Sequence, residues 1–202
     1  MNDSIAQFSQ RDSRWGKITL GASPYNIRDW GCTITSTARI CYLLTGKIYD
    51  PGVLAKKLGF TADGLLIWES MQRIGMKASR IRQNPSLDLI KANAGKMIIE
   101  LNYSPRHWVA VEGVDIWGNI EVMDPLTGNL SKKKRSEITA YTLFEPTEPL
   151  PPVLSEYDKL VIEATKFVKD IGVSNGERPT EMVPRQELWI MLMRAVKHLE
   201  KK

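Results

Sequence analysis

The sequence predicts an α+β domain in which helices come first and an antiparallel sheet follows. Apolar residues recur at helical spacing between Thr33 and Leu44, whereas runs of strand length begin near Lys96. Four prolines fall between Glu145 and Pro152, and such a stretch excludes a helix or a central strand. We therefore expect a domain over residues 1–145, a proline-rich linker over 146–154 and a helical module over 155–202.

The elements follow from the spacing of apolar residues and from the turn residues between them. Helices are predicted over residues 33–44, 53–58, 65–74 and 87–92, and Gly46 suits a left-handed cap at the end of the first. Strands are predicted over residues 96–101, 107–115, 119–123 and 140–144. The segment Trp117-Gly118-Asn119 supplies a tight turn, which brings His107 and Asp124 to the same end of the sheet. Beyond the linker, apolar stripes predict two helices, over residues 156–170 and 185–199.

Composition and charge bound the class of protein. Of 202 residues, 43% are apolar and 25% charged, which is typical of a soluble globular chain. No apolar run approaches the roughly 20 residues of a membrane span, and the first eight residues do not form a signal peptide. We expect a protein that is cytoplasmic on synthesis, either remaining there or leaving the cell by lysis or in a virion. It should have no membrane span.

The net charge of +5 lies mainly on the first domain. Residues 1–144 carry 19 basic and 13 acidic side chains, whereas residues 155–202 carry nine and eight. The densest basic run, Lys132–Arg135, lies in a turn-rich segment and is interpreted as solvated surface, so no nucleic-acid partner is expected. A mild positive field would attract a polyanionic cell-wall surface.

Cysteine, histidine and aspartate each stand at the end of a predicted element. Cys32 stands at the start of the first helix, where unpaired N–H groups and the helix dipole favour a thiolate. The second cysteine, Cys41, falls on the opposite helix face and is expected in the core, so neither a disulfide nor a metal site is expected. His107 opens a strand and is the only histidine before the linker, which makes it the candidate base. Asp124 would orient the imidazole; its alternative role is to start a turn before Pro125.

Several positions around these three have alternatives. Asp115 is the rival to Asp124, although it lies at the far end of the histidine strand. An oxyanion would need the Cys32 backbone N–H and a side-chain amide, for which Gln10 is the candidate, although spacing does not separate it from Gln7. Gly31 would let a substrate backbone approach closely. Trp30 and Trp108 flank the candidate nucleophile and base and are candidate walls of a substrate cleft.

These residues resemble the C39-like branch of the papain-like cysteine peptidases over roughly residues 7–145. The resemblance rests on Gln10-Arg-Asp12-Ser-Arg-Trp15-Gly16, Trp30-Gly31-Cys32-Thr-Ile-Thr-Ser36, Tyr42-Leu-Leu-Thr-Gly46, Arg106-His107-Trp108-Val109-Ala110-Val111 and Met123-Asp124-Pro125. It implies a papain-like fold with Cys32 as nucleophile, His107 as base, Asp124 as orienting residue and Gln10 as oxyanion donor. The sequence departs from many relatives at Thr33-Ile34, where they carry Gly or Ala and then Pro.

The tail resembles a segment of surface-layer homology modules, through Gly172–Pro179, Val183–Leu188 and Met193–Ala195. Similar segments end some phage and bacterial peptidoglycan hydrolases, which implies contact between residues 155–202 and a cell-wall polymer. The leading expectation is a peptidoglycan endopeptidase, of the phage-lysin or cell-wall-hydrolase type, that cleaves stem or cross-bridge peptides without a cofactor. The alternatives are a non-catalytic module that binds wall or protein, an intracellular peptidase, and an amidase or transferase that uses the same three residues.

Overall fold

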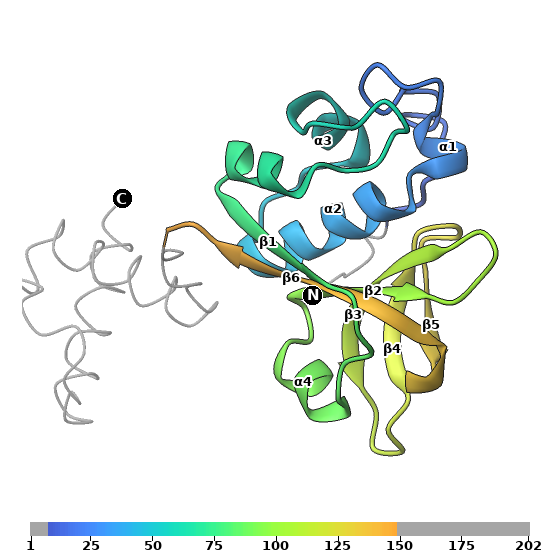
Figure 1. Cartoon of the computed structure of the whole chain (residues 1–202), viewed down its shortest axis with the longest axis vertical. Coiled ribbons are helices and arrows are strands. Elements are labelled where there is room, and N and C mark those ends of the chain that lie inside the picture. The colour runs from blue at the N-terminus through green and yellow to red at the C-terminus, as the bar shows by residue number, and fades with distance from the viewer. Residues whose placement is uncertain (1–7, 149–202) are drawn as a thin grey trace, which may run out of the picture. The chain divides into compact units, whose positions relative to one another are not determined.

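A computed structural model describes residues 8–148 of the chain. The chain divides into two units, Met1–Leu150 and Pro151–Lys202. The predicted helical module over 155–202 and most of the predicted linker lie outside the described residues. The described part has the predicted α+β class, with helices packed on a six-stranded antiparallel sheet (Figure 1).

The described residues form six helical segments, of which all but the last precede the second strand. They are α1 (Ile27–Trp30), α2 (Cys32–Thr45), α3 (Pro51–Lys57), the 3₁₀-helix η2 (Trp68–Ile74), α4 (Leu87–Ala92) and the 3₁₀-helix η3 (Arg135–Glu137). The strands are β1 (Met76–Ile81), β2 (Met97–Leu101), β3 (His107–Val114), β4 (Ile120–Asp124), β5 (Asn129–Lys133) and β6 (Ile138–Pro146). Their order across the sheet is β1-β6-β2-β3-β4-β5, and every neighbouring pair is antiparallel.

The central strands are buried on both faces. Along β2, Ile98 belongs to the core that also contains Ala38 of α2, whereas Ile99 belongs to a second core with Ile90 of α4. Alternate residues of a strand point to opposite faces, so α2 and α4 cover opposite faces of the sheet, as Figure 1 shows. The face covered by α2 is the one on which Cys32 lies, because Cys32 is the first residue of that helix.

The predicted helix at residues 33–44 is confirmed as α2, with Gly46 in the left-handed conformation at its end (φ 66°). The strands predicted over 96–101, 107–115, 119–123 and 140–144 are confirmed as β2, β3, β4 and β6 within two residues, except that β6 is longer at both ends. The helix predicted over 65–74 is wrong in type and extent, because only Trp68–Ile74 is helical and it is a 3₁₀-helix.

The sequence analysis missed two strands, β1 and β5, and the one-turn helix α1. Both strands lie at the edges of the sheet, and Met76 is the only buried residue in either of them. Edge strands are commonly short and charged, so the apolar alternation on which the prediction depended is weak. Helix α1 has four residues, too few for a periodic pattern.

Two polar contacts fix α2 against β3. The buried Ser36 hydroxyl donates to the Trp108 carbonyl at 3.1 Å. One turn further along, the Arg39 guanidinium donates through Nε and Nη2 to the two Glu112 oxygens, both at 2.8 Å. Positions three apart lie on the same face of a helix, so both contacts set the position of α2 along β3.

We expect Arg39→Met to destabilise the domain by about 3 kcal/mol, because it leaves the largely buried Glu112 carboxylate without its charged partner. The matched control is Arg14→Met, which removes the same charge from an ion pair whose arginine side chain is 71% exposed and should cost less than about 1 kcal/mol. Urea unfolding followed by tryptophan fluorescence measures both. Equal losses in the two variants would contradict the structural role of the Arg39–Glu112 pair.

Candidate active site

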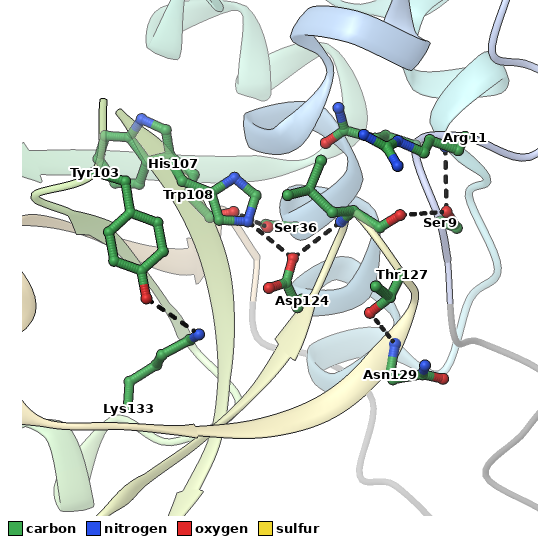
Figure 2. Close-up of polar contacts among 12 residues, drawn as sticks. Ser9, Arg11, Ser36, Tyr103, His107, Trp108, Asp124, Thr127, Asn129 and Lys133 are labelled. Atoms are coloured by element: carbon green, nitrogen blue, oxygen red, sulfur yellow. Dashed lines mark hydrogen bonds and ion pairs between the residues drawn. The ribbon is translucent and has the colours of Figure 1, made fainter. Parts of the chain in front are cut away.

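His107 and Asp124 lie at the ends of neighbouring strands and contact each other. His107 is the first residue of β3 and Asp124 the last residue of β4, and these strands are antiparallel neighbours. His107 Nε2 lies 2.8 Å from Asp124 Oδ1 (Figure 2). The Leu126 backbone N–H donates to the same oxygen at 3.0 Å. Asp124 therefore also begins the turn that contains Pro125, so its two predicted roles, as partner of His107 and as turn residue, coexist.

Cys32 lies on the other side of the imidazole. It is half-buried and begins α2 directly after the N-cap residue Gly31. Its side chain is a hydrogen-bond partner of His107. Because Nε2 faces Asp124, Nδ1 is the ring nitrogen left for the thiol. The structure thus brings the predicted cysteine, histidine and aspartate into one series of contacts.

The surroundings of His107 favour its protonated form. Burial of the ring would by itself lower the pKa, but hydrogen bonds to Asp124 and Cys32 and the negative charge of both groups outweigh it. Together they raise the pKa of His107 from 6.5 to about 9. An imidazolium beside a cysteine and a carboxylate is the charge arrangement of an activated thiol site.

Asp124 remains ionised beside the imidazole. Burial would raise the pKa of its carboxyl, but the hydrogen bonds from His107 and the Leu126 N–H lower it below its ordinary value. The rival residue, Asp115, lies at the far end of β3, where it accepts from Lys132 Nζ at 2.8 Å and from Asn119. Asp115 is therefore excluded as the partner of His107.

Gln10 lies between the aspartate turn and the helix that leads to the cysteine. Its backbone N–H donates to the Pro125 carbonyl at 2.7 Å, and its side-chain Nε2 donates to the Arg28 carbonyl in α1 at 2.8 Å. The side chain is buried, and its Oε1 has no hydrogen-bond partner among residues 8–148. Ser9 fixes the same segment, since its hydroxyl donates to the Leu126 carbonyl (Figure 2). The alternative candidate, Gln7, lies outside the described residues.

The structure gives a different reason for Gly31 from the expected one. A Cβ at this buried position would lie 2.3 Å from the Ile27 carbonyl oxygen and 2.6 Å from the Ile27 side chain. Gly31 therefore allows the close contact between α1 and the start of α2. Packing thus requires a glycine here, and the approach of a substrate backbone to Gly31 stays a prediction.

The two candidate cleft tryptophans differ. Trp30 is 51% exposed and packs on Tyr25, with 4.6 Å between ring centroids, so it is open to a substrate. Trp108 is 7% exposed and contacts Trp68 edge-on. The prediction that Trp108 lines the cleft is wrong, because its side chain points into the core beneath α2.

Tyr103 is a neighbour of the site that the sequence analysis did not select. Its ring is stacked on the His107 imidazole, with 6.3 Å between centroids and 9° between planes. Its hydroxyl donates to Glu137 and accepts from Lys133, the second contact being drawn in Figure 2. Tyr103 lies in the segment between β2 and β3, and a tyrosine outside a regular element carries no periodic signal that would indicate stacking.

Comparisons with known proteins add no relative. No family model matches the chain, and no curated protein matches it. Within residues 8–148, no three His, Cys, Asp or Glu side chains are grouped closely enough to hold a metal ion. No helix in that part of the chain has the length and hydropathy needed to cross a bilayer.

We expect the pKa of His107, near 9 in the native protein, to fall in Cys32→Ala and in Asp124→Asn, because each change removes a hydrogen bond and a negative charge. The chain has two histidines, so a titration of ring resonances by NMR resolves this one. Since the folded pKa lies above 6.5, the stability that it contributes is complete below pH 6.5 and is lost as the pH rises through about 9. An unchanged pKa in both variants would contradict the geometry.

We also expect iodoacetamide to label one cysteine in the native protein and two in urea. Burial raises the pKa of the Cys41 thiol to about 12, which leaves almost no thiolate at neutral pH, whereas Cys32 is half-buried beside an imidazolium. Peptide mass spectrometry locates the label. Native labelling at Cys41, or none at Cys32, would contradict the site.

Proposed function

We propose that the protein is a cysteine peptidase of the papain-like, C39-like type, and that its substrates are peptides of the bacterial cell wall. The observation that carries the proposal is the contact series in which His107 bridges the Asp124 carboxylate and the Cys32 side chain. The order of helices and antiparallel sheet is compatible with the fold that the sequence resemblance implies. Each residue in the series also stands where its element begins or ends, and of the three only Cys32 and Asp124 are partly exposed, since His107 is buried.

In the proposed mechanism, the Cys32 thiolate attacks the carbonyl carbon of the scissile amide and forms a tetrahedral intermediate. Protonated His107 gives its proton to the leaving amine, the C–N bond breaks, and a thioester on Cys32 remains. Neutral His107 then takes a proton from water, whose oxygen attacks the thioester. Collapse of the second intermediate releases a carboxylic acid and returns the Cys32 thiolate and the His107 imidazolium. Asp124 holds the Nε2 proton throughout, which keeps Nδ1 directed at the reacting atoms.

Two hydrogen-bond donors are candidates for stabilising the oxyanion. The Cys32 N–H belongs to the first turn of α2, where backbone donors lack partners within the helix. The Gln10 amide has two hydrogens, and the Arg28 carbonyl accepts from Nε2, which leaves the second hydrogen for the oxyanion. Both donors are held by backbone contacts, so they need little reorganisation as negative charge develops.

The wall assignment depends on sequence features rather than on the site. The tail over residues 155–202 resembles modules of wall-associated proteins, and the first domain carries the excess of positive charge, which suits a polyanionic surface. An intracellular peptidase would use the same chemistry on other peptides.

Thr33-Ile34 lies directly after the nucleophile, and Ile34 is buried in the core beneath the sheet.

We expect the wild-type protein to release amino groups from purified peptidoglycan and Cys32→Ala to lose at least about 1,000-fold of that rate, because the thiolate is the nucleophile. The matched control is Cys41→Ala, which removes the same thiol from a buried position and should retain the activity of the protein that remains folded. Mass spectrometry of the fragments identifies the bond.

The other outcomes separate the alternatives. If Cys32→Ala still releases amino groups from peptidoglycan, the assignment as a cysteine peptidase is contradicted. No release from the wild type, with wild type and Cys32→Ala both pelleting with the wall, would favour a binding module. Related thiol folds also act on glutamine side chains, and ammonia released from glutamine peptides would identify an amidase or a transglutaminase.

A further inference from the structure

A cavity of about 420 Å³ lies beside the candidate active site. Three arginines line it, Arg80 and Arg82 near the end of β1 and Arg106 in the turn before β3, together with Glu100 of β2. Tyr103 also lines this cavity. We call it the arginine pocket. Neither the peptidase mechanism nor the packing of the core uses Arg82 or Arg106.

The arginine pocket lies on the face of the sheet that α2 covers, and Tyr103, one of its lining residues, links it to His107. Arg106 directly precedes His107, and the Tyr103 ring is stacked on the imidazole. Glu100 pairs across the sheet with Trp108, and directly opposed residues share a face. Trp108 belongs to the core beneath α2, so the pocket opens on the face where α2 begins with Cys32.

The charge of the pocket is positive and only partly neutralised. Glu100 is 3% exposed and accepts from Arg80 Nη2 at 3.1 Å and from Arg106 Nη1 at 3.4 Å. Arg80 also lies over the Trp108 ring, 5.2 Å from its centroid, so it is fixed on two sides. Arg82 is exposed and forms no ion pair within residues 8–148, and the Arg106 side chain is 74% exposed. Three guanidinium groups against one carboxylate leave a surplus of two positive charges around the cavity.

Guanidinium groups held in a fixed fork are suited to a carboxylate, which accepts two parallel hydrogen bonds. His107 protonates the leaving amine in the proposed mechanism, and Tyr103, whose ring is stacked on His107, lines this cavity. We infer that the arginine pocket binds a carboxylate of the peptide substrate on the leaving side of the scissile bond. The enzyme would therefore prefer peptides with an acidic side chain or a free carboxyl terminus there. This inference rests on the proposed peptidase function.

The test measures protection of Cys32 from iodoacetamide by acetylated tetrapeptides, using the full-length chain and mass spectrometry. One peptide set carries a single glutamate at each position in turn and an amidated end. A second peptide has glutamine in place of glutamate and a free carboxyl end, and a third has glutamine and an amidated end. The variants are Arg82→Gln and Arg106→Gln, with Arg73→Gln as the control, because Arg73 is an exposed arginine outside the pocket. The labelling rate without peptide shows whether each variant keeps the site intact.

We expect at least one carboxylate peptide to protect Cys32 at a concentration about fivefold lower than the neutral peptide, as one partly exposed ion pair allows. Arg82→Gln and Arg106→Gln should abolish that difference, and Arg73→Gln should retain it. Protection by the glutamate set identifies an acidic side chain, and protection by the free end identifies a chain terminus. Equal protection by the neutral peptide, or a preference unchanged in both pocket variants, would overturn the inference.

Protection needs no bond cleavage, so the two proposals fail separately. Arginine-dependent protection in a protein that releases nothing from cell walls would refute the wall peptidase and leave a carboxylate site beside Cys32. Wall hydrolysis that depends on Cys32, with no preference for carboxylate peptides, would refute the pocket and leave the peptidase.

Discussion

The contact between α2 and β3 is the constraint on which the candidate site depends. Cys32 is carried by the helix and His107 by the strand, and neither element fixes their separation by itself. The Ser36–Trp108 hydrogen bond and the Arg39–Glu112 pair set the position of the helix along the strand. Because Cys32 and His107 each lie near the first of these contacts, a shift of one helical turn, about 5.4 Å, would separate the thiol from the imidazole.

Opposing electrostatic effects decide the charge state of this site. Burial of His107 works against its charge, yet the carboxylate and the cysteine on either side more than compensate. The same logic operates next to it, where Glu100 is almost fully buried and is held by two arginines. In both places a carboxylate that is buried or half-buried holds a cationic side chain in position. The charges around the site are therefore already oriented before a substrate binds.

The positions of the candidate site residues were predictable from the sequence because these residues lie at the ends of strongly periodic elements. Helix α2 and strands β3 and β4 have clear apolar patterns, so the positions of Cys32, His107 and Asp124 at one end of the sheet followed from the order and direction of the elements. The contacts that Gly31 and Trp108 make could not be predicted in this way. The approach of α1 to α2 and the packing of Trp108 beneath α2 are tertiary features, and adjacency in sequence to a catalytic candidate carries no information about which way a side chain points.

The surroundings of the site were hidden for a physical reason. The arginine pocket is built from several segments, which include Arg80 of the edge strand β1, Glu100 of β2, Ala140 of β6 and the turn before β3. Strand β1 is short and mostly polar, as edge strands commonly are, so its strand signal is weak and Arg80 resembles any solvated arginine. The ends of the central strands are thus predictable from local periodicity. Arg80 reaches the arginine pocket because β1 pairs with β6, whose partner residues lie 60 to 70 positions further along the chain.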